Sequence, residues 1–127
     1  MLWGEIMQTI KFKYDFKKLE NDEFLTIRRT DKGSEIGQSV IIKSPSMEFL
    51  ANVVEIEKIM LGDISTIRLA RDLDLMEEYD KVDLIDARQT YHFKQKCLEK
   101  LKEFYKDIKW NDCVYIFTIK AKRNRGG

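Results

Sequence analysis

Short apolar runs separated by polar turns fill the first 60 residues and predict β-strands. Ile10, Phe12 and Tyr14 alternate with lysines, which is the two-residue period of a half-buried strand. A Val/Ile-rich run at 40–42 predicts another strand, and the segment 47–60 predicts a third one that is long for a globular sheet. This spacing of short strands favours a sheet of mostly antiparallel neighbours.

The long strand changes its apolar register within its own length. Phe49, Ala51 and Val53 share one face, and the apolar positions then move to Val54 and Ile56. Such a change indicates a bulge or a sharp bend, which small barrels use to carry one strand around a corner.

The strand 24–30 is the most informative segment, because its two faces differ in chemistry. Successive side chains of a strand point to opposite faces. Leu25 and Ile27 are therefore predicted to enter the core, while Thr26 and Arg28 point the other way and line a cleft. A strand with one apolar face and one hydroxyl-plus-guanidinium face can serve as a binding platform.

Helical segments are predicted at three places. The polar residues 16–23 suit a short helical turn with Asp15 as a possible N-cap, and a helix after residue 62 is capped by Asp63 or Ser65. A further helix is predicted to start near Asp83 and to carry one apolar stripe, formed by Thr90, Phe93, Cys97, Leu101 and Phe104.

The last strand is predicted at 113–121, with apolar residues on both faces. The order is then strand, short helix, three strands, two helices and a final strand. This order predicts an α+β fold with a small curved β-sheet or β-barrel and flanking helices. A chain of 127 residues with one proline and no low-complexity run predicts a single domain over 1–127.

Composition excludes several classes of protein. The formal net charge is +1 although 35% of the residues are charged, and cations gather in a basic C-terminal tail at 120–127. No glycine-rich phosphate loop or dinucleotide fingerprint is present, so no cofactor is predicted. No apolar run is long enough for a signal peptide or a membrane span, which predicts a cytoplasmic protein, and the Lys/Glu/Ile usage is thermophile-like.

The cysteines and the single histidine do not suggest a catalytic or metal centre. Cys97 and Cys113 do not form a metal-ligand spacing with His92, so no metal site is predicted and both thiols are expected to be buried. His92 lies beside the apolar stripe and is interpreted as a helix-surface residue.

Four short motifs together resemble the ASCH family, within the PUA-like superfamily of small β-barrel domains. They are a helix leading into Thr26-Ile27-Arg28, a glycine turn at 36–40, the phase-changing strand 49–56, and a closing Val-Tyr-Ile-Phe strand at 114–117 after Tyr105. The motifs span about residues 9–121. The resemblance implies a PUA-like barrel that binds RNA beside the Thr-Ile-Arg strand.

One branch of that family hydrolyses acetylated cytidine with a lysine three positions before the strand threonine and a downstream carboxylate. Here the threonine matches Thr26, but Glu23 occupies the lysine position and has no amine to offer. Asp72 and Asp74 are candidates for the downstream carboxylate without a secure alignment. The resemblance therefore favours binding over catalysis, with Thr26, Glu23, Asp72 and Asp74 as the catalytic candidates.

The predicted partner is RNA or another single-stranded nucleic acid. The predicted binding set consists of Thr26, Arg28, Arg29, Lys32, Lys43, Lys120, Lys122, Arg123 and Arg125. Trp110 and Tyr115 are possible stacking partners for unpaired bases. Two alternatives stay open, a small hydrolase acting on a modified nucleoside or RNA, and a protein-interaction domain with no nucleic-acid role.

Overall fold

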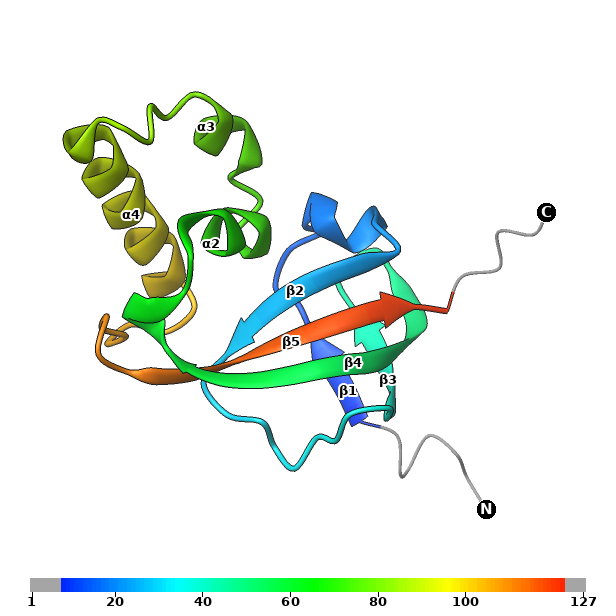
Figure 1. The fold of residues 1–127 in the computed structure, drawn as a ribbon. Helices are drawn as coiled ribbons and strands as arrows, with labels where there is room; N and C mark the ends of the chain where they lie inside the picture. Colours follow the sequence, from blue (N-terminus) through cyan, green and yellow to red (C-terminus); the bar gives the residue numbers. More distant parts are fainter. Residues whose placement is uncertain (1–7, 123–127) are drawn as a thin grey trace, which may run out of the picture. The chain divides into compact units, whose positions relative to one another are not determined.

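The computed structural model describes residues 8–122. The chain divides into two compact units, unit 1 with residues 1–57 and 115–127, and unit 2 with residues 58–114. This division does not test the prediction that residues 1–127 form a single domain. The elements, in chain order, are β1 (Gln8–Lys11), η1 (Lys17–Glu20), β2 (Glu23–Arg28), β3 (Ser39–Lys43), β4 (Glu48–Met60), η2 (Leu61–Asp63), α2 (Thr66–Asp72), α3 (Met76–Asp80), α4 (Ala87–Lys102) and β5 (Cys113–Ala121) (Figure 1).

The strands form one five-stranded sheet in the order β1-β3-β4-β5-β2. β3 pairs with β4 and β2 pairs with β5 in antiparallel fashion, whereas β1 pairs with β3 in parallel. The parallel pair is possible because the chain passes through η1, β2 and the loop 29–38 between β1 and β3. Strands and helices together confirm the predicted α+β class.

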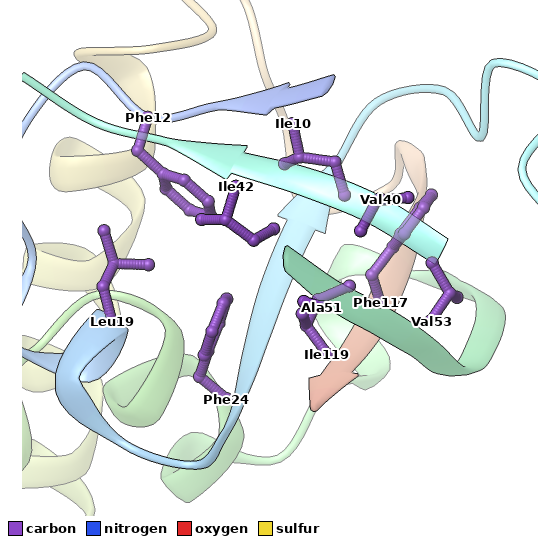
Figure 2. Close-up of a cluster of buried hydrophobic side chains, with 10 residues drawn as sticks. All are labelled: Ile10, Phe12, Leu19, Phe24, Val40, Ile42, Ala51, Val53, Phe117 and Ile119. Atoms are coloured by element: carbon purple, nitrogen blue, oxygen red, sulfur yellow. The ribbon is translucent and has the colours of Figure 1, made fainter. Parts of the chain in front are cut away.

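The core of unit 1 collects buried side chains from all five strands (Figure 2). Ile10 comes from β1, Phe24 from β2, and Leu19 is added by η1. The remaining members are Phe12, Val40, Ile42, Ala51, Val53, Phe117 and Ile119. A flat sheet cannot bring both of its edge strands to one cluster, so the sheet is curved around this core.

The face of β2 that carries Phe24 and Thr26 lies inside, contrary to the prediction. Phe24 belongs to the core cluster, and Thr26 on the same face is only 3% exposed. Thr26 lies opposite Phe117 of β5, another core residue, which places the threonine on the inner face. Ile27 is buried as predicted, but Leu25 is only half-buried. The prediction that Leu25 enters the core and Thr26 faces a cleft is therefore wrong.

The segment between β1 and β2 differs from its prediction in two places. Tyr14 is 46% exposed and does not continue the buried face of Ile10. Asp15 does not cap η1, which begins after Phe16 and has no side-chain cap. The Asp15 carboxylate instead accepts hydrogen bonds from the Ser44 hydroxyl (2.6 Å) and the Ser46 amide (3.1 Å). These two bonds lower the pKa of Asp15 and hold the loop to the turn between β3 and β4.

The change of register in β4 is present. Ala51 and Val53 are buried in the core cluster, and Ile56 packs against the same cluster although it is three residues further on. Val54 was expected to join the inner face, but it is 43% exposed. The inward positions therefore skip two residues where the strand bends.

Unit 2 contains the helices. Ser65 caps α2, because its hydroxyl accepts a hydrogen bond from the Arg68 amide. Of the two predicted caps, Asp63 and Ser65, the structure thus selects Ser65. The later helix begins at Ala87 with Asp86 as its N-cap rather than near Asp83, because the separate short helix α3 ends shortly before it. None of the described helices is long and apolar enough to cross a membrane.

The predicted apolar stripe is confirmed in its middle part, whereas Thr90 is half-buried and Phe104 lies beyond the end of α4. Phe93, Cys97 and Leu101 are buried, and the Phe93 ring meets Tyr79 of α3 edge-on at 5.8 Å. The turn after α4 is held close to η2, because the Gly62 amide donates to the carbonyl of half-buried Trp110 (2.7 Å).

The two cysteines have opposite environments, so the prediction of two buried thiols is wrong for Cys113, which is exposed. Cys97 is fully buried, and burial together with the nearby Asp72 charge raises the pKa of its thiol to about 11. We expect a thiol reagent at pH 8 to modify Cys113 quickly and Cys97 only when the protein unfolds.

Mass spectrometry of the native and the urea-unfolded protein measures this difference. The Cys113→Ser variant is the control and should leave the native protein almost unmodified. Equal labelling rates for both thiols in the native protein would contradict the buried position of Cys97.

Candidate nucleic-acid interface

The Arg28 guanidinium is held in place at the end of β2. Its Nε donates to the Thr26 hydroxyl (3.1 Å), and its Nη2 donates to the Lys11 carbonyl at the end of β1 (3.1 Å). The Arg28 Cζ atom lies 4.7 Å from the centroid of the Phe12 ring, a cation–π distance. Arg28 itself is half-buried. Its orientation is thus set by three neighbours while part of the group still reaches solvent.

Lys18 is a second cation at the same place, and it is only 5% exposed. A buried ammonium needs compensating partners. Its Nζ donates to the Leu25 carbonyl of β2 (2.8 Å) and lies 5.4 Å from the Phe12 ring and 5.5 Å from the Phe16 ring. Lys18 therefore attaches η1 to the edge of β2.

The two edge strands of the sheet meet at these side chains. β1 and β2 are the first and last strands in the order of the sheet, β1 pairing with β3 and β2 with β5. Arg28 of β2 bonds to the backbone of β1, and Phe12, which follows β1, lies against both Arg28 and Lys18. We call this arrangement of Phe12, Lys18 and Arg28 the β1–β2 seam.

An aromatic series connects the seam to the surface. The Phe12 and Phe16 rings lie 6.1 Å apart edge-on, and Tyr14 meets Phe16 at 5.9 Å in the same geometry. Tyr14 is the exposed member, and the Lys13 ammonium lies 5.7 Å from its ring. The surface beside the seam thus offers an aromatic ring with a cation next to it.

Further cations lie at the same ends of β1 and β3. Lys11 and Lys43 are exposed neighbours in the parallel pair, and like charges at that position repel each other. Glu48 lies opposite Lys43 on β4 and offsets part of this charge. Lys11 and Lys13 are therefore exposed cations of the segment that leads from the end of β1 to the seam, in addition to the buried Lys18.

The structure separates the predicted binding residues into several places. Lys120 lies opposite Glu23 at the start of β2, the far end of that strand from Arg28. Lys122 donates from Nζ to the Ser39 hydroxyl (2.7 Å), at the opposite end of β3 from Lys43.

The other predicted cations follow β2 in the sequence or belong to the C-terminal residues. Arg29 and Lys32 are exposed in the loop after β2, and the Lys32 carbonyl accepts a bond from the Gln8 side chain (3.1 Å). Arg123 and Arg125 lie outside the described residues.

The four catalytic candidates are divided between the two units. Glu23 is exposed at the start of β2, and the Thr26 hydroxyl is buried against Arg28. Asp72 and Asp74 belong to unit 2, where Asp72 is buried near Cys97. Within residues 8–122, no three His, Cys, Asp or Glu side chains are placed to hold a metal ion.

Lys18, Phe12 and Tyr14 belong to this site although the sequence did not predict them as parts of it. Lys18 appeared as one polar residue of a helical turn, and Phe12 as ordinary core. One available signal was the density of aromatic and lysine residues between positions 11 and 18, where the two residue types take seven of eight places.

Comparison with known proteins gives a relationship without a described activity. No family model and no solved structure matches the chain. A protein of the archaeon Methanocaldococcus jannaschii, named only as uncharacterized, is 33% identical over 103 residues, which is 74% of this chain and 90% of that protein. At this identity and coverage, the chain belongs to the same family as the Methanocaldococcus jannaschii protein.

Proposed function

We propose that unit 1 binds single-stranded RNA on the surface beside the β1–β2 seam, as a PUA-like barrel similar to the ASCH family. The observation that carries the proposal is the fixed, half-buried Arg28 guanidinium, which bonds to the backbone of Lys11 in the segment that also carries the exposed Lys13 and Tyr14. The five-stranded sheet curved around one core supports the barrel part of the proposal.

The chemistry of these groups fits an unpaired nucleotide. The two hydrogen bonds of Arg28 use two of the five N–H donors of a guanidinium, so other donors can bind a phosphate or a base edge. The Tyr14 ring can stack on a base, which favours unpaired strands because bases in a duplex are already stacked. Lys11 and Lys13 supply charge for the phosphates.

A double substitution tests the proposal. We expect Lys11→Ala/Lys13→Ala to weaken binding of a single-stranded RNA of about twelve nucleotides and to reduce the salt slope by about 1.4, since each lost phosphate contact removes about 0.7. Fluorescence anisotropy titrations at several salt concentrations give the slope. The matched control is Lys106→Ala/Lys109→Ala in unit 2, which removes the same charge.

The outcomes separate the proposal from its alternatives. Wild-type protein that does not bind RNA at low salt would remove the nucleic-acid function. Equal losses in the two double variants would show a diffuse electrostatic attraction without a site beside the seam.

A further inference from the structure

α4 of unit 2 is a basic helix in an otherwise acidic unit. Five cations and one carboxylate between Ala87 and Lys102 give this helix a formal charge of +4. The preceding residues 63–86 carry eight carboxylates and three cations. The charges of unit 2 are therefore segregated along the chain.

Three of the five cations and two rings of α4 lie on the side away from the core. Phe93, Cys97 and Leu101 are buried, and residues three or four positions apart share a face of a helix. The residues on the opposite side, which we call the α4 outer face, are Arg88, Tyr91, His92, Gln95, Lys96, Glu99 and Lys102.

Two aromatic groups lie among these cations. Tyr91 is 60% exposed, and its ring lies 5.8 Å from the His92 ring at an angle of 70°. Burying such a ring is favourable, so a large exposed tyrosine beside an exposed imidazole suits a ligand with flat faces.

One of the three cations of the α4 outer face has an ion pair, and so does the neighbouring Lys100, which lies 3.6 Å from Glu103. Lys96 lies 3.7 Å from Glu78 of α3, an exposed pair of the kind that contributes little to stability. Glu99 is the single carboxylate of the outer face. Within residues 8–122, no ion pair ties Arg88 or Lys102 to an acid, so an anionic partner can approach both.

We infer that the α4 outer face is a second contact surface for single-stranded RNA, in which Arg88 and Lys102 meet phosphates and Tyr91 stacks on a base. The cations fit a polyanion, and the exposed rings favour nucleic acid over an acidic polypeptide. This inference rests on the proposed function for its ligand class, but it uses residues of the other unit. An RNA that reached both surfaces would make its second contact within the same complex, which would raise the overall affinity.

Three variants test the α4 outer face with a single-stranded RNA of about twenty nucleotides, longer than one site of this kind typically covers. Arg88→Ala/Lys102→Ala removes the two phosphate contacts. Arg71→Ala/Lys81→Ala is the matched control, because it also removes one exposed arginine and one exposed lysine from unit 2. Tyr91→Ala removes the ring.

We expect Arg88→Ala/Lys102→Ala to reduce the salt slope by about 1.4 relative to the control. Tyr91→Ala should raise the Kd roughly 5- to 150-fold with the salt slope nearly unchanged. Both are measured by anisotropy beside Lys11→Ala/Lys13→Ala, and far-UV circular dichroism checks that α4 is intact.

The outcomes distinguish the two surfaces. Losses in Lys11→Ala/Lys13→Ala with wild-type behaviour of the α4 variants would overturn this inference and leave the proposed function standing. Losses only in the α4 variants would support the inference and overturn the proposed function. A third outcome would overturn the choice of RNA in favour of an acidic polypeptide. In that outcome, Arg88→Ala/Lys102→Ala weakens the binding of poly-glutamate as well as that of RNA, and Tyr91→Ala changes neither affinity.

Discussion

Replacing Phe12 by alanine is expected to lower the free energy of unfolding by about 3–5 kcal/mol, the usual cost of removing a buried phenylalanine. Phe12 is 8% exposed and belongs to the core of unit 1 (Figure 2). Its ring also lies against the cations of Lys18 and Arg28. The substitution therefore leaves a cavity and removes the contact surface of both seam cations.

Urea unfolding followed by tryptophan fluorescence and circular dichroism measures this loss. Tyr14→Ala is the matched control, because Tyr14 is an aromatic residue of the same segment that is 46% exposed. We expect that variant to stay within about 0.5 kcal/mol of wild type, as surface substitutions usually do. A small effect of Phe12→Ala would show that the seam does not contribute to the stability of the curved sheet.

Arg28→Lys is expected to weaken binding of the preferred RNA by about 1–3 kcal/mol with little change in the salt slope. Lysine keeps the charge but not the planar fork, so it cannot hold Thr26 and the Lys11 carbonyl while presenting further donors. We also expect a loss of stability of about 1 kcal/mol, because one of the two bonds cannot be replaced.

The control for this substitution is the neighbouring arginine. Arg29→Lys changes an exposed side chain, and it should leave the RNA affinity close to wild type. Anisotropy is measured at a temperature where thermal unfolding shows both variants to be fully folded. Equal affinities of Arg28→Lys and wild type would show that Arg28 bridges the strands without touching RNA.

The orientation of β2 shows why strand faces were harder to predict than strands. The segment that begins at Phe24 has apolar side chains on both faces, because Phe24 lies on one face and Leu25 and Ile27 lie on the other. Periodicity alone then permits two registers that differ by one residue. The pairing of Thr26 with Phe117 of β5 selects the register in which Thr26 is inside, and that pairing joins residues distant in the sequence.

The contacts of the β1–β2 seam could not be predicted from the sequence either. Arg28 is 17 residues from Lys11, and Lys18 is seven residues from Leu25, so each bond depends on where the chain returns. A lysine in a polar turn is ordinarily exposed, and nothing local marks Lys18 as buried. It is buried because η1 lies against the edge of β2, where a carbonyl and two rings compensate the ammonium.

The sequence by itself determined the strands of this protein and its helices α2 and α4, but not the separate short helix α3. Alternating apolar residues specify the strands, the apolar stripe of α4 specifies its buried side, and Ser65 specifies the start of α2, because each of these signals acts over a few neighbouring residues. Only the tertiary structure decided which face of β2 is inside and which cations gather beside Arg28. Those properties depend on strand pairing and on the return of the chain to the β1–β2 seam, and no local pattern encodes contacts of that range.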